Sequence, residues 1–462
     1  MFIGREKELK LLNTLVTSDK FECLILYGRR RVGKTALLQY FSREHKTIFY
    51  SAKEKNDPLN LKNFSETVQL AIEGNSFGEF TDWEAAFTYI GKHAQDERLT
   101  VIIDEFPFIA ATNPSVKSIL QHVIDHLWQA SKVFLILCGS SISFMENEVM
   151  GYKSPLYGRA TAQLELLPFD YLTSAKFFPN YDNINKLLAY GILDGIPFYL
   201  KAFSDKLSIK ENIKRNILSY GSILKEEPQI LLRMEFREPG IYNSIFEAIA
   251  KGASKMNDIS MGARIDSSKC SKYLSSLQEI KLINKNVPCS EPPTSKKSIY
   301  SFRDNFYAFW YRYIFEINDA LDFLDEEELA SDITANLNEY MGPIFEKICT
   351  QYMTNQAKAH NLPIVPWKIG RWWGNNPILK KQDDIDILCL DKSETKAIFC
   401  ECKFRNEAFD IKEYRDLMNA SEIFHSIKEK YFYILAKGGF TEAVNAQAKI
   451  DGVKLLTIDD LF

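Results

Sequence analysis

The chain has 462 residues and a mass of 53.3 kDa, which predicts two to four domains. With 46% hydrophobic and 26% charged residues, its composition excludes a wholly disordered protein, a fibrous repeat and a coiled-coil rod. The net charge of −4 excludes a general attraction to nucleic acid, so any such binding requires a local basic patch.

Membrane and export signals are absent from the sequence. No apolar run approaches the ~18–20 residues that a membrane span needs, and the first residues lack the apolar core of a signal peptide. We therefore expect a cytoplasmic protein with no membrane partner. The eight cysteines form no pair of CxxC motifs, which argues against a zinc site.

Strand-like and helical segments alternate over residues 21–144. Strands are expected at residues 23–27, 47–50, 100–103 and 133–138. This order predicts an α/β fold with a parallel sheet flanked by helices. Residues 170–241 then show the three-to-four spacing of apolar residues that predicts helices.

The segment after the first expected strand fits the phosphate-binding pattern GxxxxGK[ST]. Glycines let the backbone wrap a phosphate, and the N–H groups at the start of the following helix point at it. Lys34 would reach the β- and γ-phosphates of ATP, and Thr35 would hold Mg²⁺. The residues of this loop are Gly28, Arg29, Arg30, Arg31, Val32, Gly33, Lys34 and Thr35.

Acidic and small polar residues follow two further strands. Asp104 ends a buried strand and is the expected Mg²⁺ partner, while Glu105 would orient or deprotonate the attacking water. Ser140 or Ser141 would sense the γ-phosphate, or form an ordinary polar turn. Arg159 would stabilise transition-state charge, in its own chain or in a neighbouring copy, unless it is a surface arginine.

These motifs together resemble the archaeal-type ATPases, an AAA-related branch of the signal-transduction ATPases with numerous domains. The resemblance covers about residues 1–230 and implies a nucleotide switch with a helical lid, in which the Gly-Ile-Pro segment starts a lid helix. One departure is Asp194, where the family often has glycine. The matching segments are residues 2–6, 28–35, 103–106, 139–141, 154–159 and 195–200.

Residues 251–300 contain nine Lys or Arg and four Asp or Glu, a local charge of +5. Helices at residues 242–250, 256–263 and 267–280, followed by a hairpin over 283–302, predict a winged helix-turn-helix. Phosphate or base contacts are expected from the second motif helix and the wing tip, unless the module is a protein spacer. These residues are Ser267, Ser268, Lys269, Ser271, Lys272, Lys296 and Lys297.

The C-terminal part carries an acid followed by Glu-x-Lys. In a strand, residues two apart share a face, so Glu401 and Lys403 should point the same way, with Asp386 on the neighbouring strand. Two carboxylates that hold Mg²⁺, and a lysine that polarises the attacking water, suit phosphodiester cleavage.

This pattern is similar to the PD-(D/E)xK nuclease signature, in which Glu346 would add a carboxylate from the preceding helix. The usual proline is absent, which leaves open whether Asp384 or Asp386 leads. Over about residues 300–462 the chain also resembles the uncharacterised domain that is commonly fused to these ATPases, which implies a restriction-endonuclease-like α/β fold. The tryptophans at 372–373 and the aromatic cluster at 310–313 would stack on bases or pack in the core.

Four parts are therefore expected: a P-loop ATPase core (1–168), a helical lid (169–235), a winged helix (236–303) and a nuclease-like domain (304–462). The predicted function is an ATP-dependent enzyme in defence or DNA processing, with ATP and Mg²⁺ as cofactors. Double-stranded DNA would bind through residues 251–300 and the C-terminal domain. The alternative is a nucleotide-switched DNA- or protein-binding regulator that does not cleave, and the sequence leaves a homo-oligomer open.

Overall fold

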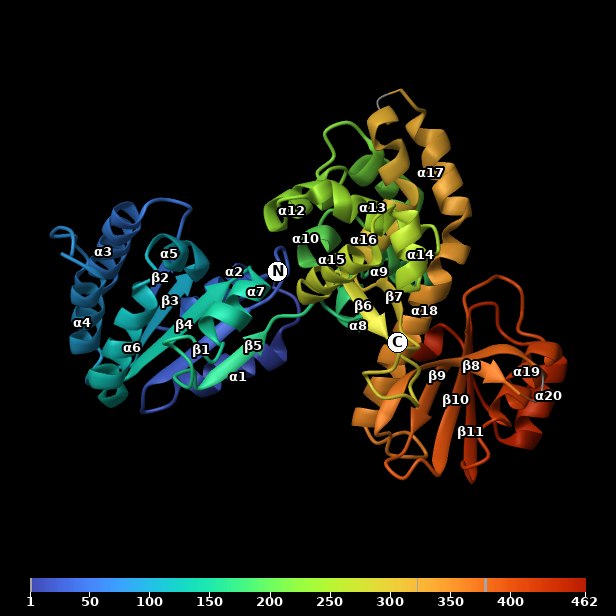
Figure 1. Cartoon of the computed structure of the whole chain (residues 1–462). Helices are drawn as coiled ribbons and strands as arrows, with labels where there is room; N and C mark the ends of the chain where they lie inside the picture. Colours follow the sequence, from blue (N-terminus) through green and yellow to red (C-terminus); the bar gives the residue numbers. More distant parts are fainter. Residues whose placement is uncertain (1, 322, 378–379) are drawn as a thin grey trace. The chain divides into compact units, whose positions relative to one another are not determined.

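The computed structural model describes residues 2–321, 323–377 and 380–462. They divide into two compact units (Figure 1). Unit 1 comprises residues 1–169 and 196–198, and unit 2 comprises residues 170–195 and 199–462. The chain therefore passes from unit 2 into unit 1 for three residues and then returns.

Unit 1 is built on a parallel five-stranded sheet in the order β2-β3-β4-β1-β5. The four expected strands are confirmed. The edge strand β5 was not predicted, because its residues are mostly polar and only partly buried. The strands are β1 (Glu22–Tyr27), β2 (Thr47–Ser51), β3 (Leu99–Asp104), β4 (Val133–Gly139) and β5 (Ala162–Glu165).

Both faces of this sheet are covered by helices, as the continuous apolar runs of β3 and β4 require. Successive side chains of β1 alternate between the two faces: Leu24 packs with α1 and α2, and Ile25 with α3 to α6. Helices of unit 1 are α1 (Glu6–Val16), α2 (Lys34–Phe41), α3 (Asp57–Glu73), α4 (Trp83–His93), α5 (Phe106–Thr112), α6 (Val116–His126) and α7 (Ile142–Phe144).

Unit 2 begins with short helices in the place of the expected lid. They include α8 (Tyr171–Ala175), α9 (Asn183–Leu193), α11 (Ile209–Ile213) and α12 (Glu227–Glu235), while α10 (Pro197–Leu200) begins in unit 1 and ends in unit 2. As expected, the Gly-Ile-Pro segment leads into a helix, because α10 begins at Pro197.

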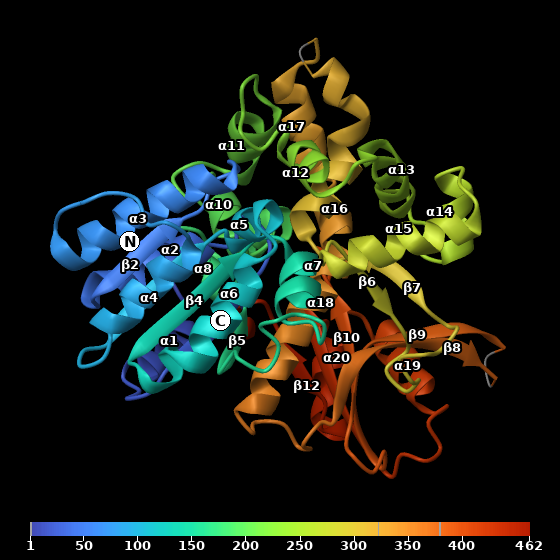
Figure 2. The ribbon, with the colours of Figure 1, turned by 60° about the vertical axis from the view of Figure 1, so that its left-hand side comes forward.

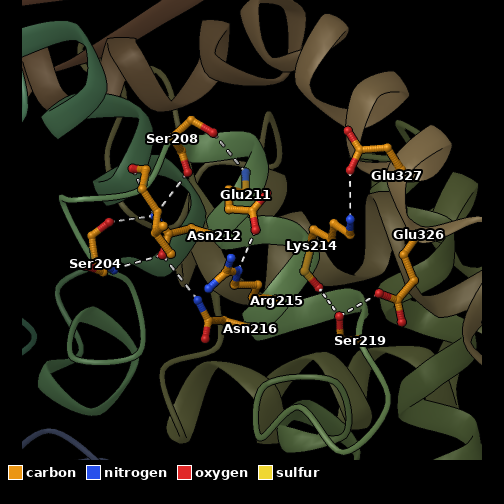
Figure 3. A network of polar contacts seen from close by, with 11 residues as sticks. Ser204, Ser208, Glu211, Asn212, Lys214, Arg215, Asn216, Ser219, Glu326 and Glu327 are labelled. Atoms are coloured by element: carbon orange, nitrogen blue, oxygen red, sulfur yellow. Dashed lines mark hydrogen bonds and ion pairs between the residues drawn. The ribbon is translucent and has the colours of Figure 1, made fainter.

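A polar network fixes α11 to α17 (Glu326–Ala335) (Figure 3). Glu327 forms ion pairs with Lys210 and Lys214, and Ser219 donates a hydrogen bond to Glu326. In α11, the fully buried Asn212 donates to the carbonyl oxygens of Ser204 and Ser208. These contacts connect two helices that lie more than a hundred residues apart in sequence.

The expected three helices and hairpin follow the lid (Figure 2). Helix α15 buries Cys270, Leu274 and Leu277 and leaves its serine- and lysine-rich side exposed. The elements are α13 (Pro239–Ala250), α14 (Met256–Gly262), α15 (Ser267–Glu279), β6 (Ile283–Asn286) and β7 (Ile299–Phe302), with β6 and β7 antiparallel.

The C-terminal part of unit 2 contains a mixed five-stranded sheet in the order β12-β11-β10-β9-β8. Strand β9 pairs antiparallel with β8 and β10, whereas β11 runs parallel to β10. The strands are β8 (Lys368–Asn376), β9 (Lys381–Leu390), β10 (Lys396–Lys403), β11 (Glu429–Ala436) and β12 (Lys454–Leu456), and the helices are α16 (Asn305–Tyr313), α18 (Leu337–Lys358), α19 (Ile411–Ser421) and α20 (Glu442–Asp451).

Asp194 ends α9 with φ 57° and ψ −166°, a conformation that is essentially confined to glycine. Its buried carboxylate accepts hydrogen bonds from the N–H groups of Gly195 and Asn305. Burial, and the nearby carboxylate of Asp304, raise the pKa of Asp194 to about 6. The backbone conformation gives a physical reason why glycine suits this position, and the hydrogen bonds show what holds aspartate there.

Replacing Asp194 separates these two effects. Asp194→Ala should lower the free energy of unfolding of unit 2 by roughly 3–5 kcal/mol, because two buried N–H groups lose their acceptor and the strain remains. Asp194→Gly should cost roughly 1–2 kcal/mol less, since glycine relieves the strain. Urea unfolding of the full chain measures both, and equal losses would contradict the strain argument.

Candidate functional site

Parallel pairing brings the expected nucleotide-binding residues to one edge of the sheet in unit 1. β1, β3 and β4 all end there, and each is followed by one motif. The phosphate loop follows β1, Asp104 and Glu105 lie at the end of β3, and Ser140 follows β4. Ligands in open parallel sheets bind at this carboxyl edge.

The phosphate loop depends on two glycines. Gly28 has φ 149°, and a Cβ atom there would lie 2.4 Å from the carbonyl oxygen of Leu166. Gly33 has φ 97° at the residue before α2. Arg31 also adopts a left-handed conformation, and its guanidinium lies 4.1 Å from the ring centroid of Phe198. The backbone thus takes the curved path that a phosphate cradle needs.

Lys34 and Thr35 lie at the start of α2 and contact two different partners. The Lys34 ammonium donates to the carbonyl oxygens of Gly28 and Arg29, at 2.8 and 3.0 Å. Burial lowers the pKa of Lys34. Thr35 Oγ1 donates to Asp104 Oδ2 at 2.7 Å, so the structure brings together the two residues that the sequence predicts as the Mg²⁺ site.

Glu105 is held by Ser140. Its Oε2 accepts hydrogen bonds from Ser140 Oγ at 2.9 Å and from the Ser140 N–H at 3.3 Å. Glu105 has φ 53°, so the chain turns sharply between β3 and α5. Ser140 thus contacts the second acid of the site, and its sensing of a γ-phosphate stays a prediction.

Arg5 supports the phosphate loop, a role that the sequence reasoning did not assign. Its buried guanidinium donates to the carbonyl oxygen of Val32 at 3.0 Å and lies 4.1 Å from the ring centroid of Phe169. Glu8 pairs with it at 3.0 Å. The sequence feature that marks this role is the Gly-Arg-Glu segment near the N-terminus, which also contributes to the family resemblance.

Arg159 lies beside α6. It forms two hydrogen bonds with the Asp125 carboxylate, at 2.6 and 2.9 Å, and two with the carbonyl oxygens of Pro155 and Tyr157. In the part of the chain that the structure describes, these contacts do not place Arg159 next to Lys34. A role in transition-state stabilisation stays a prediction.

The C-terminal carboxylates come from β9, β10 and α18. Lys403 forms an ion pair with Glu401, which confirms that these side chains share a face of β10. β9 contacts β10 as expected. In the β8–β9 ladder, Gly370 pairs with Leu388 and Trp372 pairs with Ile385. Two residues of β9, Asp386 and the one after it, therefore lie opposite a single residue of β8. Such a bulge redirects side chains at a strand end.

Burial and mutual repulsion dominate the electrostatics of this cluster. They raise the pKa of Glu346 to about 8 and that of Glu401 to about 7, with Asp386 the repelling neighbour in both cases. Burial also raises the pKa of Asp386, which accepts a hydrogen bond from the Cys402 N–H at 2.8 Å. Asp386 is therefore close enough to Glu346 and Glu401 to disfavour their charged forms.

Ion pairs already neutralise part of the cluster. Arg371 contacts Glu346 at 3.1 Å and also pairs with Asp384, while Lys403 pairs with Glu401. In residues 2–321, 323–377 and 380–462, no group of three or more His, Cys, Asp or Glu is arranged to hold a metal ion. The oxygen donors suit Mg²⁺ chemically, but an ion would have to displace these cations from the carboxylates.

The aromatic residues divide between the core and a cavity. Trp310 is fully buried and donates to the carbonyl oxygen of Lys225 at 2.7 Å. Trp372 packs against Phe424, with 5.1 Å between ring centroids. Trp373, by contrast, lines a cavity in unit 2. The prediction of core packing is thus confirmed for Trp310 and Trp372, whereas Trp373 lines the cavity.

Comparison with known proteins identifies the chain. Residues 2–203 match a family described as an ATPase domain predominantly from Archaea, and residues 310–416 match one described as archaeal and bacterial proteins of unknown function. The chain is 37% identical over 444 residues to Uncharacterized protein MJECL04 of Methanocaldococcus jannaschii, across 95% of this chain and 96% of that protein. This chain belongs to the archaeal-type ATPase family.

Similar solved structures were found for part of this chain, and the first of them shares its fold. The Walker-type ATPase paby2304 of Pyrococcus abyssi superposes with a TM-score of 0.52 and 20% identity, covering 67% of this chain and 96% of that one. The ORC2 protein of Aeropyrum pernix gives a TM-score of 0.47 and 13% identity, covering 68% and 92%. Membership of an ATPase family implies nucleotide binding.

Across its described residues, this archaeal-type ATPase has no helix of the length and apolarity that crossing a bilayer requires.

Replacing Glu105 with Gln should preserve nucleotide binding and remove turnover. Glutamine keeps the side-chain shape and can still contact Ser140, but it cannot take a proton from water. We expect ATP hydrolysis to fall by roughly 10²–10⁴-fold, the usual contribution of a positioned base. Phosphate release measures turnover, and fluorescence of a labelled ATP analogue measures binding.

Two variants serve as controls for this experiment. Lys34→Ala should lose binding, since it removes the ammonium at the phosphate loop. Glu148→Gln changes an exposed acid that pairs with Lys117 and should leave both readouts unchanged. Hydrolysis by Glu105→Gln at the wild-type rate would show that another group is the base.

Proposed function

We propose that this chain hydrolyses ATP with Mg²⁺ and uses the nucleotide state to control a DNA-binding and nuclease-like unit 2. The hydrogen bond between Thr35 and Asp104 at the phosphate loop carries the first part of the proposal. Thr35 and Asp104 would hold the ion, Lys34 would contact the β- and γ-phosphates, and Glu105 would act on the attacking water. The bound ion supplies neutralisation of phosphate charge.

The control of unit 2 by ATP is supported by the path of the chain. Residues 196–198 belong to unit 1, whereas Gly195 and Tyr199 on either side belong to unit 2. Within unit 1, Phe198 lies against Arg31 of the phosphate loop. A change in this loop on nucleotide binding would therefore act on a segment that is covalently joined to unit 2 at both ends.

DNA binding through a winged helix is supported by the surface of α15. Lys269 and Lys272 are exposed on this helix, on the side away from the buried Cys270, Leu274 and Leu277. Asp266 caps the helix by accepting from the Lys269 N–H at 3.0 Å. The wing lysine Lys297 is instead paired with Glu291 at 2.7 Å. Helix α15 is therefore the proposed phosphate-contacting element.

The double variant Lys269→Ala, Lys272→Ala tests this interface. Loss of two phosphate contacts should weaken duplex binding regardless of sequence and reduce the salt slope by roughly one to two units. Fluorescence anisotropy at several salt concentrations measures both quantities. Lys297→Ala is a matched control with a smaller expected effect, and unchanged binding by the double variant would favour the spacer interpretation.

Phosphodiester cleavage is proposed for the cluster of Asp386, Glu401, Lys403 and Glu346. Asp386 accepts a hydrogen bond from the N–H of Cys402, the residue between Glu401 and Lys403, and this contact supports a shared site for the three side chains. The carboxylates would hold Mg²⁺, which supplies charge neutralisation at the phosphodiester, and Lys403 would polarise the attacking water. This proposal assigns the restriction-endonuclease-like fold to residues 304–462.

A regulator that binds without cleaving is the second candidate. The ion pairs of Arg371 with Glu346 and of Lys403 with Glu401 favour it, because they satisfy the carboxylates without a metal. Both candidates share the ATP site and the exposed face of α15. They differ in whether a divalent ion can displace the two cations.

Asp386→Ala and Glu401→Ala should each abolish Mg²⁺- or Mn²⁺-dependent nicking of plasmid DNA. ATP turnover should be unchanged, because the ATP residues lie in unit 1. Lys403→Ala should keep metal binding but lose cleavage rate by roughly 10²–10⁴-fold. Gel analysis of plasmid forms measures nicking, and a wild-type chain that does not cleave with either metal would favour the regulator.

A further inference from the structure

Unit 2 contains a cavity of about 640 Å³ next to the C-terminal carboxylates. Its walls come from the end of α13, the hairpin strand β7, helices α16 and α18, and the tips of β8 and β9. A cavity of this size can hold one or two nucleotides, since ligand sites typically measure roughly 300–1,000 Å³. The cavity belongs neither to the ATP site nor to the exposed face of α15.

The cavity lining combines apolar surface with aromatic rings and cations. Ile249, Phe302 and Ile344 supply apolar surface, and Trp373 and Tyr300 supply aromatic rings. Arg312 and Arg371 supply guanidinium groups, each also paired with a carboxylate, and Asp383 and Asp384 supply negative charge. Aromatic rings beside guanidinium groups suit a ligand that has a flat base and a phosphate.

The strand pairing explains how Trp373 reaches this cavity. Trp373 lies opposite Asp384 in the β8–β9 ladder, and both residues line the cavity. The preceding Trp372 points to the other face of the sheet, where it packs against Phe424. Neighbouring tryptophans thus have different environments, and Trp373 is the one available to a ligand.

Arg371 connects the cavity to the carboxylate cluster. It lines the cavity and contacts Glu346 at 3.1 Å. One of its terminal nitrogens faces Glu346 and the other faces Asp384. Because a guanidinium has five N–H donors, these two ion pairs leave further donors for a phosphate.

We propose that this cavity binds an unpaired nucleotide of a DNA strand, with its base against Trp373 and its phosphate near Arg371. The proposal rests on the proposed action on DNA and adds the substrate class: a single strand, or a duplex with an unpaired segment. A base inside an intact duplex is stacked on its neighbours and must leave the stack to enter such a cavity. The strand would then continue from the cavity toward the carboxylates.

Trp373→Ala tests this assignment by equilibrium binding with Ca²⁺ in place of Mg²⁺. Three fluorescein-labelled probes are compared: a single-stranded 20-mer, a blunt duplex and a duplex with an unpaired flap. The variant should bind the single strand and the flap roughly 5- to 150-fold more weakly, the loss expected for ~1–3 kcal/mol of base stacking. Its affinity for the blunt duplex should change less than about twofold.

Matched variants separate stacking from misfolding. Trp367→Ala removes another tryptophan, which is 67% exposed and does not line the cavity, and should bind all probes as the wild type does. Trp373→Phe retains a ring and should restore most of the single-strand affinity. Thermal unfolding compares the stability of the three variants.

Several outcomes would overturn the proposal. Equal weakening on all three probes, or no change on any, would show that Trp373 does not bind an unpaired base. Competition by dAMP as strong as that by the oligonucleotide would assign the cavity to a free nucleotide.

If the wild type never cleaves but Trp373→Ala still loses single-strand affinity, the cavity assignment stands and only the cleavage proposal fails.

Discussion

The buried carboxylate of Asp194 is the interaction on which the arrangement of unit 2 depends. It accepts from the first N–H of α16, at Asn305, and the Asn305 side chain accepts from Lys347 of α18 at 3.1 Å. Lys347 also donates to the carbonyl oxygen of Phe302 at the end of β7. One acid therefore connects the end of α9 with α16, α18 and the hairpin. Buried polar groups are tolerated when they are hydrogen-bonded, and the hydrogen bonds of Asp194 and Lys347 meet that condition.

The position of this network gives it functional importance. Glu346 immediately precedes Lys347 on α18, and the cavity is lined by residues of α18, α16 and β7. On the other side, Asp194 and Gly195 precede the three residues that belong to unit 1. The helices that hold the proposed nuclease-like site and the segment next to the phosphate loop thus share one anchoring point.

The two acidic sites of the chain differ in how their charge is balanced. In unit 1, Asp104 accepts hydrogen bonds from two neutral groups, the Thr35 hydroxyl and the Glu105 N–H. In unit 2, Arg371 and Lys403 pair with Glu346 and Glu401. A divalent ion in unit 2 would have to replace these ion pairs, which lowers the free energy that its binding there would gain.

The sequence by itself predicted the phosphate-binding motif and four of the five strands of the sheet in unit 1. The spacing of Gly28, Gly33, Lys34 and Thr35 is local, and the apolar runs of β1, β3 and β4 predict parallel strands whose ends must converge. It also predicted that Glu401 and Lys403 share a face, because alternation along one strand is a local property.

Only the tertiary structure decided features that depend on contacts between distant segments. Examples are the support of Val32 by Arg5, the pairing of Arg159 with Asp125, and the opposite environments of Trp372 and Trp373. The bulge in β9 and the polar edge strand β5 carry no strong local pattern. Asp194 was visible in the sequence only as a departure from glycine, and its role follows from partners more than a hundred residues away.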